Sequence, residues 1–81
     1  MNLPSESVRF HKNGLEFLSS AALPPWTEVT VDLQAPDNSR IQGAAIVVAC
    51  DGNARTGYVV SLMFTGLSPQ AESRLGQLAN L

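Results

Sequence analysis

Residues 41–64 constrain the fold more than any other part of this 81-residue chain. Two runs rich in apolar and β-branched residues, 41–50 and 54–64, lie on either side of an Asp51-Gly52 pair. Asp-Gly between such runs is a strong hairpin signal, because a type I′ turn needs positive φ at both central residues. The sequence therefore predicts a long central β-hairpin with its turn at Asp51-Gly52.

The two arms of this hairpin differ in their hydrophobic pattern. Residues 43–50 are apolar on both faces, which predicts that this strand is covered on both sides. The second arm alternates, with Tyr58, Val60, Leu62 and Phe64 on one face and Val59, Ser61 and Met63 on the other. A long hairpin covered on both faces implies a closed barrel or sandwich with a further element packed outside it.

Three more strands are predicted before the hairpin. Residues 7–10 and 14–19 have strand patterns and are separated by an Asn-Gly turn. Residues 26–33 show the cleanest alternation, with Val29, Val31 and Leu33 facing inward. Residues 1–7 are polar, contain a proline and are expected to form a loose lead-in. The barrel is thus expected to span residues 8–64.

The C-terminal segment predicts one helix over residues 68–80. Ser68 is a good N-cap, and Pro69 fits the first helical position because its missing N–H would be unpaired there anyway. The apolar stripe of this helix consists of Ala71, Leu75 and Leu78. We expect the stripe to cover the outer face of residues 43–50. The prediction is a mainly β fold: one domain over 1–81, a small antiparallel β-barrel with one C-terminal α-helix.

Composition and charge exclude several classes of protein. Five Lys/Arg against seven Asp/Glu give a net charge of −2, which lacks the basic surface of a nucleic-acid-binding protein. The single cysteine, Cys50, rules out a disulfide framework within the chain and reads as a small buried apolar residue. No apolar run approaches the ~20 residues of a membrane span, and no signal peptide is visible. We expect a cytoplasmic protein.

No catalytic or metal site is expected. His11 is the only histidine, and no Cys/His cluster has the spacing of a metal site. No motif places a nucleophile beside a base and an orienting carboxylate. The sequence therefore predicts no enzyme activity, no metal and no resident cofactor.

Three segments resemble the PilZ domain, a small bacterial β-barrel with a C-terminal helix whose typical members bind cyclic di-GMP. They are NGLEF at 13–17, LPPWTEVTV at 23–31 and GYVVSLMFTGLS at 57–68. These segments are similar to the glycine turn before the second strand, the loop and alternating strand that follow, and the last strand with its link to the helix. The resemblance extends over residues 8–78 and implies a PilZ-like β-barrel in bacterial signalling.

The ligand motifs of that family are not conserved here. Typical members carry RxxxR ahead of the barrel and DxSxxG at the second strand. No arginine precedes Arg9, and in the second motif Arg9 replaces the Asp and His11 the Ser, so that only Gly14 matches. Loss of the arginine clamp removes charge-assisted, bidentate contacts. The resemblance therefore supports the fold more than the ligand.

Two groups of residues are candidate binding sites. The first is a basic patch at a turn that could hold a phosphate, either of cyclic di-GMP or of another anion, with help from backbone N–H groups. It consists of Arg9, His11, Lys12, Asn13 and Gly14, and the alternative is a solvated turn. The second is an apolar patch for a protein partner. It consists of Leu18, Leu23, Pro24, Pro25 and Trp26, with the alternative that Trp26 plugs one end of the barrel.

The expected function is a non-catalytic regulatory or protein-interaction module without tight cyclic di-GMP binding, acting through a protein partner or a homo-oligomer contact. The alternative is a cyclic di-GMP sensor whose motif is degenerate or is completed by a segment or partner outside this chain. A third class, an oligonucleotide-binding barrel, needs exposed stacking aromatics. Trp26, Tyr58 and three phenylalanines are the only aromatics, and most of them are predicted to face inward.

Overall fold

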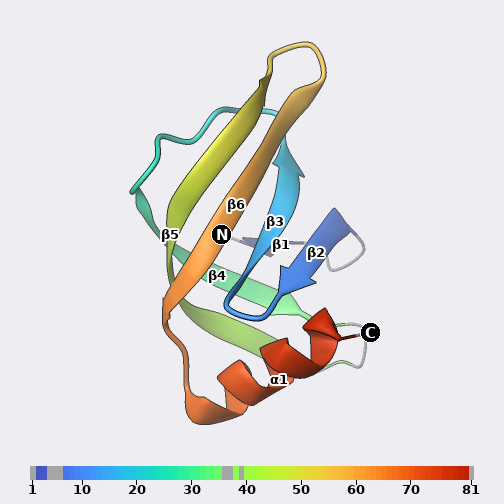
Figure 1. Ribbon diagram of the computed structural model, residues 1–81, viewed down its shortest axis with the longest axis vertical. Helices are drawn as coiled ribbons and strands as arrows, with labels where there is room; N and C mark the ends of the chain where they lie inside the picture. The colour runs from blue at the N-terminus through green and yellow to red at the C-terminus, as the bar shows by residue number, and fades with distance from the viewer. Residues whose placement is uncertain (1, 4–6, 36–37, 39, 81) are drawn as a thin grey trace.

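The computed structural model describes residues 2–3, 7–35, 38 and 40–80 and shows one curled sheet with a C-terminal helix (Figure 1). The elements are β1 (Asn2–Leu3), β2 (Val8–His11), β3 (Gly14–Ser19), β4 (Glu28–Gln34), β5 (Arg40–Asn53), β6 (Gly57–Gly66) and α1 (Pro69–Ala79). The strand order is β1-β4-β5-β6-β3-β2, antiparallel throughout except for β1, which runs parallel to β4. The predicted mainly β class with one C-terminal helix is confirmed. Asn2–Leu3 is a short strand, so the expected loose lead-in is wrong there, and residues 1 and 4–6 lie outside the described residues.

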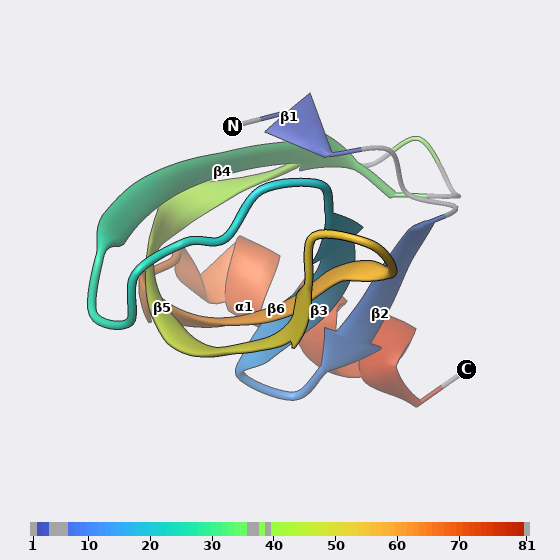
Figure 2. The same ribbon diagram turned by 90° about the horizontal axis from the view of Figure 1, so that it is seen from above.

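The sheet curls around one core but does not close into the predicted barrel. In Figure 2 the strands surround the core, the segment between β3 and β4 crosses the near end, and α1 lies at the far end. Over the described residues no ladder joins β2 to β1 or β4, at the other end of the strand order. With four residues in β2 and two in β1, these edges offer few backbone groups for pairing. The α1 helix packs beside β2 instead.

The predicted central hairpin is confirmed, but its turn lies further along the chain. Asp51 and Gly52 are still paired within the β5–β6 ladder, opposite Val59 and Tyr58. The chain reverses after Asn53, whose Oδ1 accepts hydrogen bonds from the backbone N–H groups of the second and third residues after it. The ladder resumes at a glycine, Gly57, with φ of 89°. The side-chain cap and this glycine thus fix a three-residue loop.

A bulge explains why β5 is apolar without interruption. Val47 pairs with Leu62 and Ala49 pairs with Ser61, so Val48 has no residue opposite it. An extra residue shifts the alternation of side chains by one position. Residues that face the core therefore come both before and after Val48 in the chain. No polar residue is needed between them, and the strand can be apolar without interruption.

The expectation that both faces of β5 are covered is consequently wrong. Ile41, Ala45 and Val47 are buried before the bulge, whereas Ala44 and Val48 on the same strand are exposed. One face of β5 belongs to the core and the other faces solvent.

A single core fills the curl, and α1 contributes to it. Its buried members are Leu15, Phe17, Val31, Leu33, Ala35, Ile41, Ala45, Val47, Val60, Leu62, Leu75 and Leu78. The expected inward face of the strand at 26–33 is therefore confirmed. Full burial of a leucine such as Leu75 stabilises the fold by about 1.5–3 kcal/mol. The helix begins as predicted: the N-cap Ser68 Oγ accepts from the N–H of Ala71 at 3.1 Å. It closes the inner side of the curl, so the expected position on the outer face of β5 is wrong.

Candidate functional site

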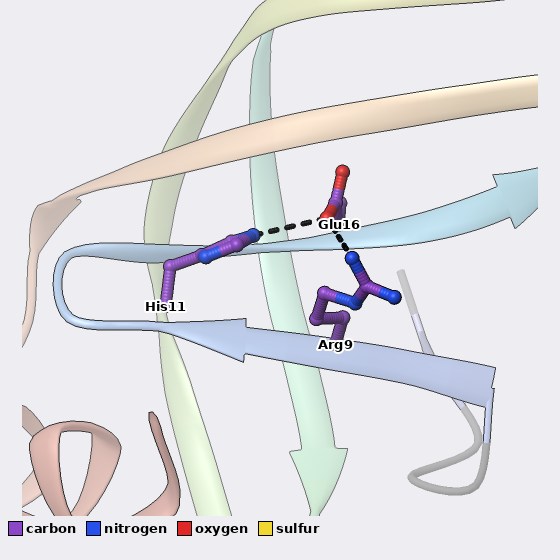
Figure 3. A network of polar contacts seen from close by, with 3 residues as sticks. All are labelled: Arg9, His11 and Glu16. Atoms are coloured by element: carbon purple, nitrogen blue, oxygen red, sulfur yellow. Dashed lines mark hydrogen bonds and ion pairs between the residues drawn. The ribbon is translucent and has the colours of Figure 1, made fainter. Parts of the chain in front are cut away.

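Arg9 and His11 project outward from β2 and share one carboxylate on β3 (Figure 3). The register places Arg9 directly opposite Glu16. Arg9 Nη1 lies 3.6 Å and His11 Nε2 3.1 Å from the same oxygen, Glu16 Oε1. The Arg9 side chain is 78% exposed, whereas that of Glu16 is only 24% exposed.

This sharing weakens the predicted phosphate site. Surface ion pairs contribute only about 0.2–1 kcal/mol each, so Arg9 and His11 are available to other partners. Any phosphate, however, would approach the carboxylate of Glu16 as well as Arg9 and His11. A third basic residue on the same face would be needed to give a strongly anion-binding surface.

Lys12 does not supply that third basic residue, because it lies with Asn13 beside a cleft that neither Arg9 nor His11 lines. The two residues form the turn between β2 and β3 and line a cleft of about 280 Å³ against the end of β6 and the first turns of α1. The Asn13 carbonyl oxygen accepts from the N–H of Phe64 at 2.9 Å, which ties the turn to β6. Glu72 of α1 lines the same cleft. The structure thus separates Lys12 and Asn13 from Arg9 and His11.

Gly14 has a structural role in the sheet. It is buried, and a Cβ atom added to it would collide with the carbonyl oxygen of Leu62 on β6. Only glycine allows β3 and β6 to approach so closely. This close approach accounts for a glycine at position 14.

The predicted apolar patch is divided between two places. Leu18 points outward from β3, is 63% exposed and lies opposite Val59 of β6. Leu23 is partly buried against the core. Trp26 precedes β4, which is three strand spacings from β3, or about 14 Å when followed along the curled sheet.

Trp26 and the prolines before it form an exposed turn. Trp26 is 69% exposed with φ of 69°, and its N–H donates to the carbonyl oxygen of Val47 at 2.6 Å. The Pro24 carbonyl oxygen accepts from Thr27 Oγ1 at 2.7 Å, and Pro25 is exposed. Trp26 therefore does not plug the end of the curl, and the alternative of an exposed aromatic stands.

Exposed apolar residues between these two places were missed by the sequence prediction. We call the outward-facing side of β3, β5 and β6 the outer face; its members include Glu16, Leu18, Ile46, Ala49, Asp51, Val59, Ser61 and Met63. Val59 and Met63 are 44% and 42% exposed. The alternation of Val59 and Met63 with Val60 and Leu62 was visible in the sequence. Because both faces of the hairpin were expected to be covered, the sequence analysis did not predict that Val59 and Met63 face solvent.

A bidentate ion pair lies near the other edge of the sheet. Arg40 Nε and Nη2 donate to the two carboxylate oxygens of Asp32 at 2.9 and 2.8 Å. These hydrogen bonds from Arg40 lower the pKa of Asp32 below its usual value of 3.8. Because both charges are satisfied by each other, the pair joins β4 to β5 rather than offering a free charge.

The described part of the chain contains no cluster of three or more His, Cys, Asp or Glu side chains that could hold a metal ion. Its buried residues include no polar or charged side chain. No helix within residues 7–35 and 40–80 has the length and hydrophobicity needed to cross a bilayer.

Comparison with known proteins finds no matching family model, no matching curated protein and no matching solved structure.

Proposed function

We propose that this chain is a PilZ-like regulatory module of bacterial signalling that binds a protein and does not bind cyclic di-GMP tightly. The observation that carries the proposal is the outer face, where Leu18, Val59 and Met63 leave large apolar side chains in solvent. Leu18 and Val59 lie opposite each other, and Met63 is four residues further along β6. Several exposed apolar side chains on one face of a small domain are characteristic of a protein interface.

The arrangement of the basic residues favours a protein over a nucleotide. At the two substituted motif positions, Arg9 and His11 are directed to Glu16, and Lys12 lies at another hollow. The two phosphates of cyclic di-GMP are bound best by several arginine side chains that converge on them and make bidentate contacts. Here Lys12 lines a cleft that neither Arg9 nor His11 lines.

The proposed module is non-catalytic and acts in the cytoplasm. In support, the ionisable side chains of the described residues are at the surface, and none of them is a buried group tuned for proton transfer. The partner proposed is a protein, or a second copy of the chain, rather than a nucleic acid, since the net charge is −2.

Calorimetric titration with cyclic di-GMP at low salt tests the proposal. We expect no binding heat up to millimolar nucleotide, with a PilZ domain that carries both motifs as the positive control. Micromolar binding that Arg9→Ala and His11→Ala both abolish would overturn the proposal and establish the alternative, a nucleotide sensor with a degenerate motif. Lys12→Ala is the matched control, because Lys12 lies beside a different hollow.

A further inference from the structure

The cleft between the β2–β3 turn and α1 is lined by two opposite charges that do not pair with each other. Lys12 of the turn and Glu72 of α1 both line it, and both side chains are exposed. Within the part of the chain that the structure describes, neither side chain forms an ion pair or a hydrogen bond. Glu16 and Asp32, in contrast, are each held by basic side chains. The cleft thus offers one cation and one anion to an occupant.

Apolar side chains also line this cleft, and the fold holds them in place. They come from β6, from the link after it and from α1, and they are Met63, Phe64, Leu67 and Leu75. Leu75 is fully buried, and Phe64 and Leu67 are half-buried. The hydrogen bond from the N–H of Phe64 to the carbonyl oxygen of Asn13 fixes the turn against β6. An apolar group in the cleft would therefore contact side chains that are already ordered.

This combination of groups favours one chemical class of ligand. A phosphate or another anion would meet the carboxylate of Glu72, and a cation would meet the ammonium group of Lys12. A neutral apolar molecule would remove both charges from water without giving either a partner, which is costly. A molecule that carries a carboxylate, an ammonium group and an apolar side chain complements the whole cleft.

We infer that this cleft binds a free α-amino acid with an apolar side chain. The ligand carboxylate pairs with Lys12, the ligand ammonium group pairs with Glu72, and the ligand side chain contacts the apolar residues of the cleft. A free amino acid carries both charges on one carbon, whereas a protein chain carries them at opposite ends. The cleft volume of about 280 Å³ is just below the usual range of roughly 300–1,000 Å³ for ligand pockets, which suits a small ligand.

This site goes beyond the proposed function and does not depend on it. The two are neighbours, however, because Met63 lines the cleft and also belongs to the outer face. A bound amino acid would therefore contact a side chain that a protein partner on the outer face also contacts.

An NMR titration of the chain with L-leucine is the first test. We expect saturable shifts of the amide signals of Asn13, Thr65 and Glu72, with a dissociation constant of about 1 mM for so small a ligand in an open cleft. The loop between β5 and β6 is at the opposite end of the molecule from α1, so its amide signals should not shift (Figure 1). An absence of saturable shifts up to tens of millimolar leucine overturns the inference.

Ligands that lack one group at a time test each contact. Leucinamide lacks the carboxylate, N-acetyl-leucine lacks the ammonium group, and glycine lacks the apolar side chain. Each should bind at least about tenfold more weakly than leucine, since each loses either a charge-assisted hydrogen bond or apolar burial. Equal binding of leucine and N-acetyl-leucinamide, which has neither charge, contradicts the inference.

Two substitutions assign the charges to their residues. Lys12→Met should bind leucine and leucinamide about equally, because the partner of the carboxylate is gone. Glu72→Gln should bind leucine and N-acetyl-leucine about equally for the corresponding reason. Arg55→Gln and Glu28→Gln are the matched controls, because they remove the same charges at exposed positions outside the cleft and should keep the wild-type preference. The spectra also report whether each variant is folded, and unchanged preferences in folded Lys12→Met or Glu72→Gln overturn the inference.

Discussion

The two sides of β6 contain similar residues with different roles. Val60 and Leu62 are 0% and 3% exposed and belong to the core, whereas Val59 and Met63 are 44% and 42% exposed on the outer face. All four are apolar and lie within one strand. Hydrophobicity alone thus does not separate residues that hold a fold from those available to a partner. The side of the strand on which they lie does.

The largest expected difference comes from truncating one residue on each side. Leu62→Ala should lower the free energy of unfolding by about 3 kcal/mol, since it removes buried methyl groups and leaves a cavity. Met63→Ala should change it by less than about 1 kcal/mol because its side chain already contacts water. Urea denaturation of both variants, at concentrations where the chain is monomeric, measures the difference. Equal losses would show that the outer face is also part of the fold.

A second pair changes polarity while keeping the shape of the side chain. Val60→Thr buries a hydroxyl group in a fully covered site and should cost about 2 kcal/mol. Val59→Thr leaves its hydroxyl group in solvent and should stay within about 0.5 kcal/mol of the wild type. Thermal denaturation at low concentration compares the two; a large loss at Val59 would indicate that this side chain is covered in solution.

A smaller change in the free energy of unfolding is expected at α1, the helix that packs on the core inside the curled sheet. Ser68→Ala removes the oxygen that accepts from the N–H of Ala71, and should destabilise the fold by about 1 kcal/mol. Ser73→Ala, on the exposed side of the same helix, is the matched control and should gain a few tenths of a kcal/mol, since alanine is the better helix former. Loss of helicity without loss of stability on Ser68→Ala would mean that α1 is not needed to cover the core.

The smallest effect is expected on the outward side of β4, and only in acid. Hydrogen bonds from Arg40 lower the pKa of Asp32 in the folded chain, so this contact stabilises the fold fully above the unfolded-state value near 3.8. The contribution is lost as the pH falls through the lower folded-state pKa. Asp32→Asn should therefore reduce stability near neutral pH and make it less sensitive to acid below 3.8. Urea denaturation at both pH values checks the sign, and an unchanged acid dependence would contradict it.

Much of the fold was predictable because it depends on local patterns. Alternation placed Val31 and Leu33 inward on β4, and the N-cap at Ser68 set the start of α1. The turn was misplaced because Asp51-Gly52 is a strong signal, whereas the cap at Asn53 acts through a side chain. Whether the sheet closes into a barrel was not predictable, since closure depends on pairing between strands that are distant in sequence.

The candidate site was predicted less well than the fold. The basic patch was predicted from sequence neighbours, but Lys12 at the turn lines a cleft that Arg9 does not line, since Arg9 lies beside Glu16 and Leu18. The contact of Arg9 with Glu16 follows from register, which a sequence pattern does not give directly. The exposure of Met63 was not predicted, because the continuous apolar run at 43–50 was taken to mean that both faces of the hairpin are covered. The structure explains that run by a bulge at Val48 instead.

The double pairing of β5 has a consequence for how the chain opens. Residues 44–46 are paired with β4 on one side and with β6 on the other, and Val47 donates to Thr27 at 3.0 Å besides lying opposite Leu62. Each of these amide groups donates to one neighbouring strand only, as Val47 does to Thr27. Because β5 lies in the interior of the sheet and contributes to the core, either neighbour can separate from these residues only when the sheet opens near its centre. Hydrogen exchange at Ala45 and Val47 should therefore be the slowest in the chain. Its rate would serve as an internal gauge of global unfolding against which the fraying of β2 or α1 can be compared.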